Sequence, residues 1–84
     1  MLFRQSHREI AMNETEIWDV LGKSETTKVP VRVTFSEDEI YEGVVIWSEG
    51  KYDSESGKDE AALEVGEDEN LFFFVEDVKE AVLV

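Results

Sequence analysis

The chain has 84 residues and no cysteine, and its 8 basic and 21 acidic residues give a formal net charge of −13 at pH 7. At this length one small core is expected, with no disulfide or thiolate zinc site to support it. The negative charge repels nucleic-acid phosphates, and no segment approaches the roughly 20 apolar residues that span a bilayer, so neither direct nucleic-acid binding nor membrane insertion is expected. Without a signal-peptide pattern at residues 1–7, the expectation is a soluble cytoplasmic protein.

Two parts are predicted along the chain. Residues 1–12 read as an N-terminal extension with scattered apolar positions, and residues 13–84 read as a single domain. Met12 directly precedes a helix cap, which raises the hypothesis of an internal start at that residue. Whether residues 1–11 belong to the native protein therefore stays open.

A short helix is predicted to begin after Asn13. Asn13 and Glu16 have the spacing of a capping box, in which each side chain accepts a hydrogen bond from the other residue's backbone N–H. Gly22 is the expected C-terminal residue, followed by a polar linker at 23–28. Apolar residues at helical spacing follow the cap, namely Ile17, Val20 and Leu21.

The next stretch predicts two strands, Val29–Phe35 and Glu39–Trp47, joined by an acidic turn at 36–38. Apolar and polar residues alternate in the first strand, which indicates one buried face. In the second strand the alternation stops after Gly43, because Val44–Trp47 are all apolar. Such a strand is either central in a covered sheet or strongly curved, and we place a bend at Gly43. If that bend needs a glycine conformation, valine at this position should destabilise the fold.

The rest of the chain predicts three more strands. Residues 48–60 are rich in serine, glycine and acids, which is typical of a loop or mobile hairpin tip. The later elements are a strand at 61–65, a turn at 66–70, a strand with three consecutive phenylalanines at 71–75, a tight turn at 76–78 and a last strand at 79–84.

The order of these elements resembles the small β-barrels of the Sm-like and SH3-like type. Three segments carry the resemblance: Val31–Phe35, Tyr41–Val45 around the glycine, and Phe74–Val82, in which an acidic and aliphatic turn leads into the closing strand. The resemblance covers about residues 13–84. It implies a mainly β fold, in which a short N-terminal helix precedes a five-stranded, strongly bent antiparallel small barrel. It also implies a homo-oligomer, dimer or ring, through pairing of edge strands.

The chain departs from the Sm family where that family binds RNA. Sm-type RNA binders carry an aspartate-and-asparagine loop after the bent strand and an arginine-or-lysine–glycine pair before the last strand. Here the corresponding segments are Glu49-Gly50-Lys51-Tyr52-Asp53 and Val75-Glu76-Asp77-Val78. RNA binding is therefore not carried over, and a divergent Sm-like RNA binder is kept only as a third hypothesis.

No residue pattern predicts catalysis, a cofactor or a metal. His7 is the only histidine and has no cysteine or strand-to-helix serine nucleophile beside it. The acidic segment Asp53–Glu60 departs from the EF-hand loop, because its fifth position is Gly57 and its sixth is Lys58. We expect a protein that is not an enzyme, with no cofactor and no metal site.

The leading hypothesis for function is a non-enzymatic accessory or regulatory module that acts through protein–protein contact, with a basic partner or a second copy. The phenylalanines of 71–75 and the two tryptophans are expected mostly to fill the core. The candidate interface comprises Trp18 on the helix and the four strand residues that the helix could leave partly uncovered, namely Val44, Ile46, Phe72 and Phe74.

The alternative hypothesis is a nucleic-acid mimic, in which carboxylates imitate phosphates and occupy the groove of a basic nucleic-acid-binding protein. It predicts that acids from several loops line one continuous face. These residues are Glu37, Asp38, Glu42, Asp53, Glu55, Asp59, Glu60, Glu67, Asp68 and Glu69.

Overall fold

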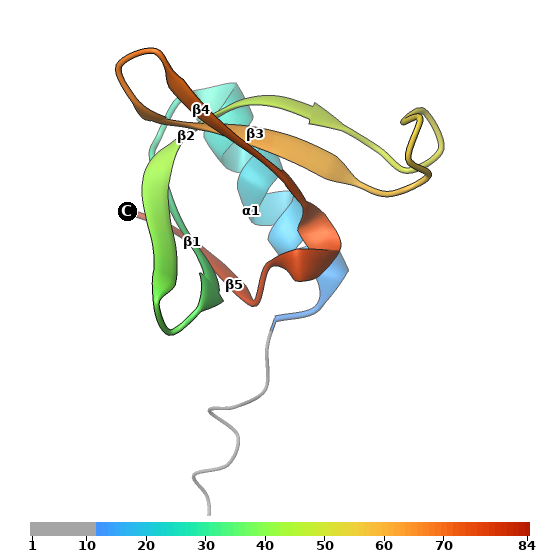
Figure 1. Cartoon of the computed structure of the whole chain (residues 1–84), viewed down its shortest axis with the longest axis horizontal. Coiled ribbons are helices and arrows are strands. Elements are labelled where there is room, and N and C mark those ends of the chain that lie inside the picture. The colour runs from blue at the N-terminus through green and yellow to red at the C-terminus, as the bar shows by residue number, and fades with distance from the viewer. Residues whose placement is uncertain (1–11) are drawn as a thin grey trace, which may run out of the picture.

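The computed structural model describes residues 12–84 as one helix packed on one bent antiparallel sheet (Figure 1). The elements are α1 (Glu14–Thr27), β1 (Val31–Ser36), β2 (Glu39–Glu49), β3 (Glu60–Gly66), β4 (Glu69–Phe74), the 3₁₀ turn η2 (Val75–Asp77) and β5 (Glu80–Leu83). The internal-start hypothesis and His7 fall on residues 1–11, which lie outside the described part.

The start of α1 agrees with the sequence. Asn13 Oδ1 accepts a hydrogen bond from the backbone N–H of Glu16 at 2.8 Å, and Glu16 Oε1 accepts one from the N–H of Asn13 at 3.1 Å. These two bonds complete the capping box. Met12, predicted to belong to the extension, packs against the core.

The predicted end of α1 at Gly22 is wrong, because the helix continues to Thr27. Lys28, with φ of 68°, takes the left-handed conformation that ends the helix. A tertiary contact accounts for the extra turn: Ser24 is fully buried, and its Oγ accepts a hydrogen bond from the N–H of Val45 at 3.1 Å.

The sheet has the strand order β4-β3-β2-β1-β5, and β2 bends so that its two halves pair with different strands. Residues 39–43 pair with β1, whereas residues 44–49 pair with β3. The predicted bend at Gly43 is therefore confirmed. The run of four apolar residues after Gly43 therefore belongs to a strongly curved strand and not to a flat central strand.

The mainly β fold with an N-terminal helix and five strongly bent antiparallel strands is confirmed, but the sheet does not close into a barrel. β4 and β5 are its two edges, and no backbone pairing joins them within residues 12–84. Side chains bridge part of the gap instead, since the rings of Phe35 on β1 and Phe73 on β4 meet edge to face at 5.3 Å.

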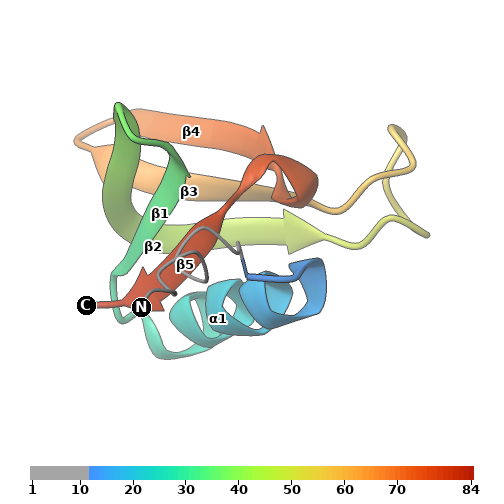
Figure 2. The same ribbon diagram turned by 90° about the horizontal axis from the view of Figure 1, so that it is seen from below.

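The core lies between α1 and the concave side of the sheet (Figure 2). α1 packs on β1, β2 and β5 and on η2. The opposite, convex side of β2, β3 and β4 is left uncovered by the helix. The residues of this core come from α1, from every strand except β4 and from the segment 75–78, and are Ile17, Leu21, Val31, Val33, Val45, Ala61, Leu63, Val75, Val78 and Ala81.

Candidate functional site

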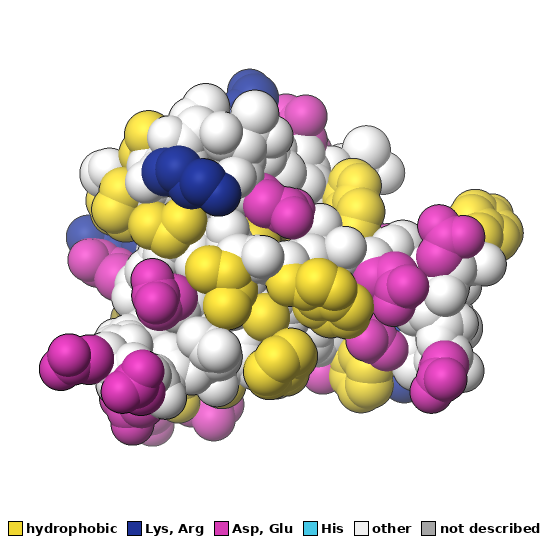
Figure 3. Space-filling model, turned by 90° about the horizontal axis from the view of Figure 1, so that it is seen from above, with side chains coloured by type: hydrophobic (Ala, Val, Ile, Leu, Met, Phe, Trp, Pro, Cys, Tyr) yellow, Lys and Arg dark blue, Asp and Glu magenta, His cyan; other side chains and the backbone are white. Residues whose placement is uncertain are grey.

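Apolar side chains gather on the convex side of the sheet formed by β2, β3 and β4. The strand registers place Trp47 opposite Ala62 and Ala62 opposite Phe72, so these three side chains share one face. Figure 3 views the molecule from the side of β3 and β4 and shows hydrophobic side chains in the middle, with Asp and Glu on both sides. We call this surface the outer face and define it as Val44, Ile46, Trp47, Phe72 and Phe74.

A β-bulge in β2 shapes the outer face. The register with β3 shifts between Val45 and Trp47, which makes Ile46 an extra residue without a partner. Val45 on one side of the bulge is fully buried, whereas Ile46 is 42% exposed. The bulge thus directs two neighbouring apolar residues, Ile46 and Trp47, toward the outer face.

Two aromatic rings form the centre of the outer face. The rings of Trp47 and Phe72 lie 6.1 Å apart at an angle of 55°. Ala62, which lies between them in the register, is fully buried, so the two rings shield it from solvent. Phe72 itself is 67% exposed. Such exposure of a large apolar ring beside another is typical of an interaction surface.

A groove of about 640 Å³ runs along β4. All four residues 71–74 line it, although successive strand side chains point to opposite faces, so the groove must follow the edge of the strand. Phe35, Glu39 and Tyr41 of the β1–β2 hairpin form the facing wall. Trp47, Ala61, Glu60 and Asp77 complete the lining.

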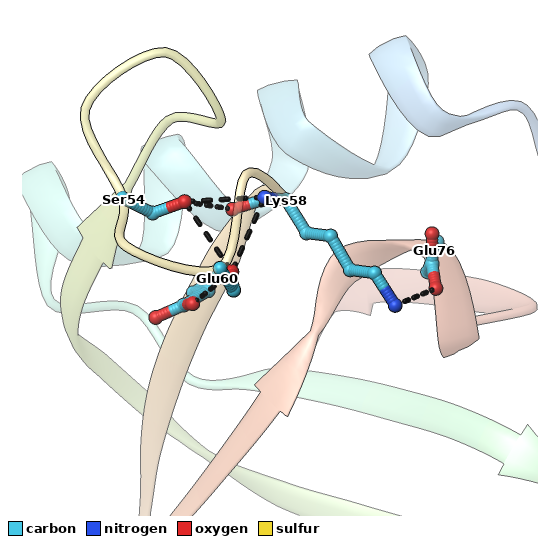
Figure 4. Close-up of polar contacts among 5 residues, drawn as sticks. Ser54, Lys58, Glu60 and Glu76 are labelled. Atoms are coloured by element: carbon cyan, nitrogen blue, oxygen red, sulfur yellow. Dashed lines mark hydrogen bonds and ion pairs between the residues drawn. The ribbon is translucent and has the colours of Figure 1, made fainter.

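The loop between β2 and β3 is held in place by its own hydrogen bonds. Ser54 Oγ donates to the carbonyl oxygen of Lys58 at 2.7 Å, and Ser56 Oγ donates to Glu60 (Figure 4). Lys58 Nζ reaches Glu76 at 3.0 Å and lies 4.8 Å from the centroid of the Phe74 ring. Lys58, whose ammonium lies against the groove residue Phe74, is therefore already paired with an acid.

Four of the five candidate interface residues are brought together. Val44, Ile46, Phe72 and Phe74 share the outer face, but Trp18 lies on α1 beside a separate small hollow formed with Lys51 and Asp59. Of the phenylalanines at 72–74, Phe73 alone packs against the core, and it is only partly buried. The candidate interface omitted Trp47, which the strand pairing places on the outer face, and also Phe35 and Tyr41, which line the groove along β4.

The ten acidic candidates do not form one continuous face. Figure 1 shows that the β1–β2 turn, the β2–β3 loop and the β3–β4 turn project at three separate corners, and these carry most of the acids. Glu42 lies on β2 and pairs with Arg32 at 2.8 Å. Mimicry of a nucleic acid requires a continuous row of carboxylates, which these separate corners do not provide.

One pair of acids lies where α1 begins. A side-chain hydrogen bond with Asp59 raises the pKa of Glu14, and partial burial and the charge of Asp59 act in the same direction. Asp59 Oδ1 also accepts a hydrogen bond from the N–H of Lys51 at 2.7 Å. The contact between Glu14 and Asp59 joins the start of the helix to the β2–β3 loop.

Within residues 12–84, no group of three or more histidine, aspartate or glutamate side chains is placed to hold a metal ion. No helix in this part of the chain has the length and apolar character to cross a membrane. Comparison of the chain with protein-family models, with curated proteins and with solved structures gave no match.

Proposed function

We propose that this chain is a non-enzymatic interaction module that binds a basic protein partner through the outer face. The observation that carries the proposal is the exposed cluster of Ile46, Trp47 and Phe72 on a sheet face that α1 leaves uncovered. Large aromatic and aliphatic side chains in contact with one another are the usual centre of a protein interface, because their burial removes apolar surface from water.

The charge of the chain supports a basic partner. A formal net charge of −13 gives a negative potential over the surface that speeds encounter with positive molecules and repels negative ones. Glu60 and Glu64 lie on the same side of the sheet as Trp47 and Phe72, so acids border the apolar cluster. A partner with apolar residues surrounded by lysine or arginine would complement both features.

The proposal retains the resemblance to the Sm-like class, with the sheet left open between β4 and β5. An N-terminal helix followed by five antiparallel strands, with the second bent at a glycine, supports that assignment. The RNA-binding segments of the family do not match this chain, so the assignment concerns architecture only. Homo-oligomerisation through an edge strand is the competing form of the same proposal, because β4 and β5 are both edges.

Site-specific photo-crosslinking tests the proposal. Benzoylphenylalanine replaces Phe72 on the outer face or, as a control, Tyr52, which is an exposed aromatic residue on the β2–β3 loop. We expect position 72 to capture a basic protein from the source cell and position 52 to capture none.

A matched pair of variants decides whether the outer face binds the captured protein. Ile46→Gln removes an exposed aliphatic side chain from the outer face, and Val82→Gln removes one of similar exposure from β5. Ile46→Gln should abolish the crosslink, whereas Val82→Gln should leave it unchanged. Equal loss in both variants would refute binding by the outer face, and a product containing only two copies of the chain would favour the homo-oligomer.

A further inference from the structure

We propose that the partner binds as an extended segment that adds a strand to the free edge of β4, with apolar side chains in the groove alternating with basic ones. This inference rests on the proposed function and specifies its mode of binding. Extended segments bind in this way when a sheet edge offers unpaired backbone groups next to pockets for alternate side chains.

The two edges of the sheet differ. At β5, the N–H of Met12 donates to the carbonyl oxygen of Lys79 at 3.0 Å, and the N–H of Ala81 donates to Met12 Sδ at 3.5 Å. Met12 thus occupies part of the outer edge of β5. β4 pairs with β3 on one side, and within residues 12–84 no backbone segment pairs with its other side. β4 is therefore the edge open to an added strand.

The groove lies where the side chains of an added strand would point. It follows β4, and Phe35, Glu39 and Tyr41 of the β1–β2 hairpin line its other side, so a segment laid beside β4 would meet two aromatic rings there. Phe35 contacts Phe73 and lies 6.0 Å from the ring of Tyr41, which makes this wall aromatic. Strand side chains alternate in direction, so every second residue of the segment would enter the groove.

The charge of the groove indicates which kind of segment can bind there. The charged residues that line the groove are all acidic: Glu39, Glu60 and Asp77. β4 itself has the sequence Glu-Asn-Leu-Phe-Phe-Phe, which contains no lysine or arginine. A second copy adding through its own β4 would bring acids against acids. A segment that alternates apolar residues with lysine or arginine matches both the groove and its charge.

The experiment uses the full chain and a capped synthetic peptide of about ten residues in which lysine alternates with valine. Binding is measured by NMR titration and by hydrogen exchange of the amides at 69–74. Two further peptides carry backbone N-methyl groups, one on every valine and one on every lysine. They have the same charge and side chains, but each lacks the N–H groups on one edge of the extended peptide.

Strand addition predicts that one N-methyl isomer binds like the parent peptide and the other binds at least about tenfold more weakly, because only one edge faces β4. Exchange at 69–74 should slow with the parent peptide. Equal affinities of the two isomers would overturn strand addition. Failure of the parent peptide to bind, while the crosslink at position 72 persists, would also overturn it and leave the proposed function standing.

A pair of charge-reversal variants tests whether the acidic residues of the groove favour a basic segment. Asp77→Lys changes a groove residue, and Asp19→Lys makes the same charge change on α1, outside the groove. We expect Asp77→Lys to weaken binding of the parent peptide several-fold at low salt. Asp19→Lys should weaken this binding much less, because exposed charges act over about a Debye length. Equal weakening would show that only the net charge matters and would overturn the local role of the groove.

Discussion

Gly43 is the residue whose replacement should damage this fold most clearly. A Cβ atom on Gly43 would lie 1.9 Å from the carbonyl oxygen and 2.8 Å from the carbonyl carbon of Glu64 on β3. Ordinary contacts between such atoms are about 3.5 Å. The reason for glycine is thus the close approach of β3, not a left-handed backbone, since Gly43 does not have a positive φ.

The expected cost follows from what must move. Glu64 belongs to the central part of β3, flanked by the fully buried Leu63, so a shift of more than about 1 Å would disturb both the β2–β3 pairing and the core. Overpacking of this kind costs about 3 kcal/mol or more, out of roughly 4–13 kcal/mol for a domain of this size. Gly43→Ala should therefore lower Tm by about 12–25 °C.

The control is a second glycine-to-alanine change. A Cβ on Gly22 would meet nothing within 4 Å, and Gly22 lies inside α1. Alanine there should raise stability by about 0.5–1 kcal/mol, because glycine is the poorer helix former. Thermal unfolding followed by circular dichroism measures both variants. If Gly43→Ala melts within about 3 °C of the parent protein, the close approach of β2 and β3 is refuted.

Three further variants test the helix and its contacts. Ser24→Ala leaves the N–H of Val45 without its buried acceptor and should cost about 1–3 kcal/mol in urea unfolding. Asn13→Ala removes the capping side chain and should cost about 1 kcal/mol by the same measurement. The pKa of Glu14 is raised above its ordinary value of 4.5 by its hydrogen bond with Asp59, so the folded state holds that proton more tightly and stability falls as pH rises above 4.5. Glu14→Gln should remove this part of the decline and raise Tm at neutral pH; an unchanged Tm–pH profile would contradict it.

The helix α1 shows which features local sequence can predict and which it cannot. The capping box depends only on neighbouring residues, so Asn13 and Glu16 predict the start of α1 correctly. Gly22 has the residue type of a helix end but lies within the helix, and Lys28 ends it without any local signal of that role. The last turn is fixed by Ser24, which contacts a strand 21 positions later in the chain. Such a contact cannot be read from helix periodicity.

The candidate site, like the helix, could be predicted from the sequence only in part. The unbroken apolar run after Gly43 indicates that both sides of β2 are covered or used, and this was sufficient to select Val44 and Ile46. The bulge that directs Ile46 and Trp47 to one side depends on pairing with β3, so Trp47 could not be assigned to the outer face. The position of α1, which determines which aromatic residues stay exposed, likewise follows from tertiary packing.

The same charge that suits a basic partner should keep copies of the chain apart, and salt can test this. At low ionic strength, the net charge of −13 opposes contact between two outer faces or two β4 edges. At about 1 M salt the Debye length falls to about 3 Å, so this repulsion is screened while apolar attraction remains. We expect a monomer in sedimentation velocity near 0.05 M salt and partial self-association near 1 M, reduced by Ile46→Gln and not by Val82→Gln. A stable dimer at low salt would contradict this reasoning, because it would require an interface strong enough to overcome the full repulsion, and it would identify the second copy as the natural occupant of the outer face.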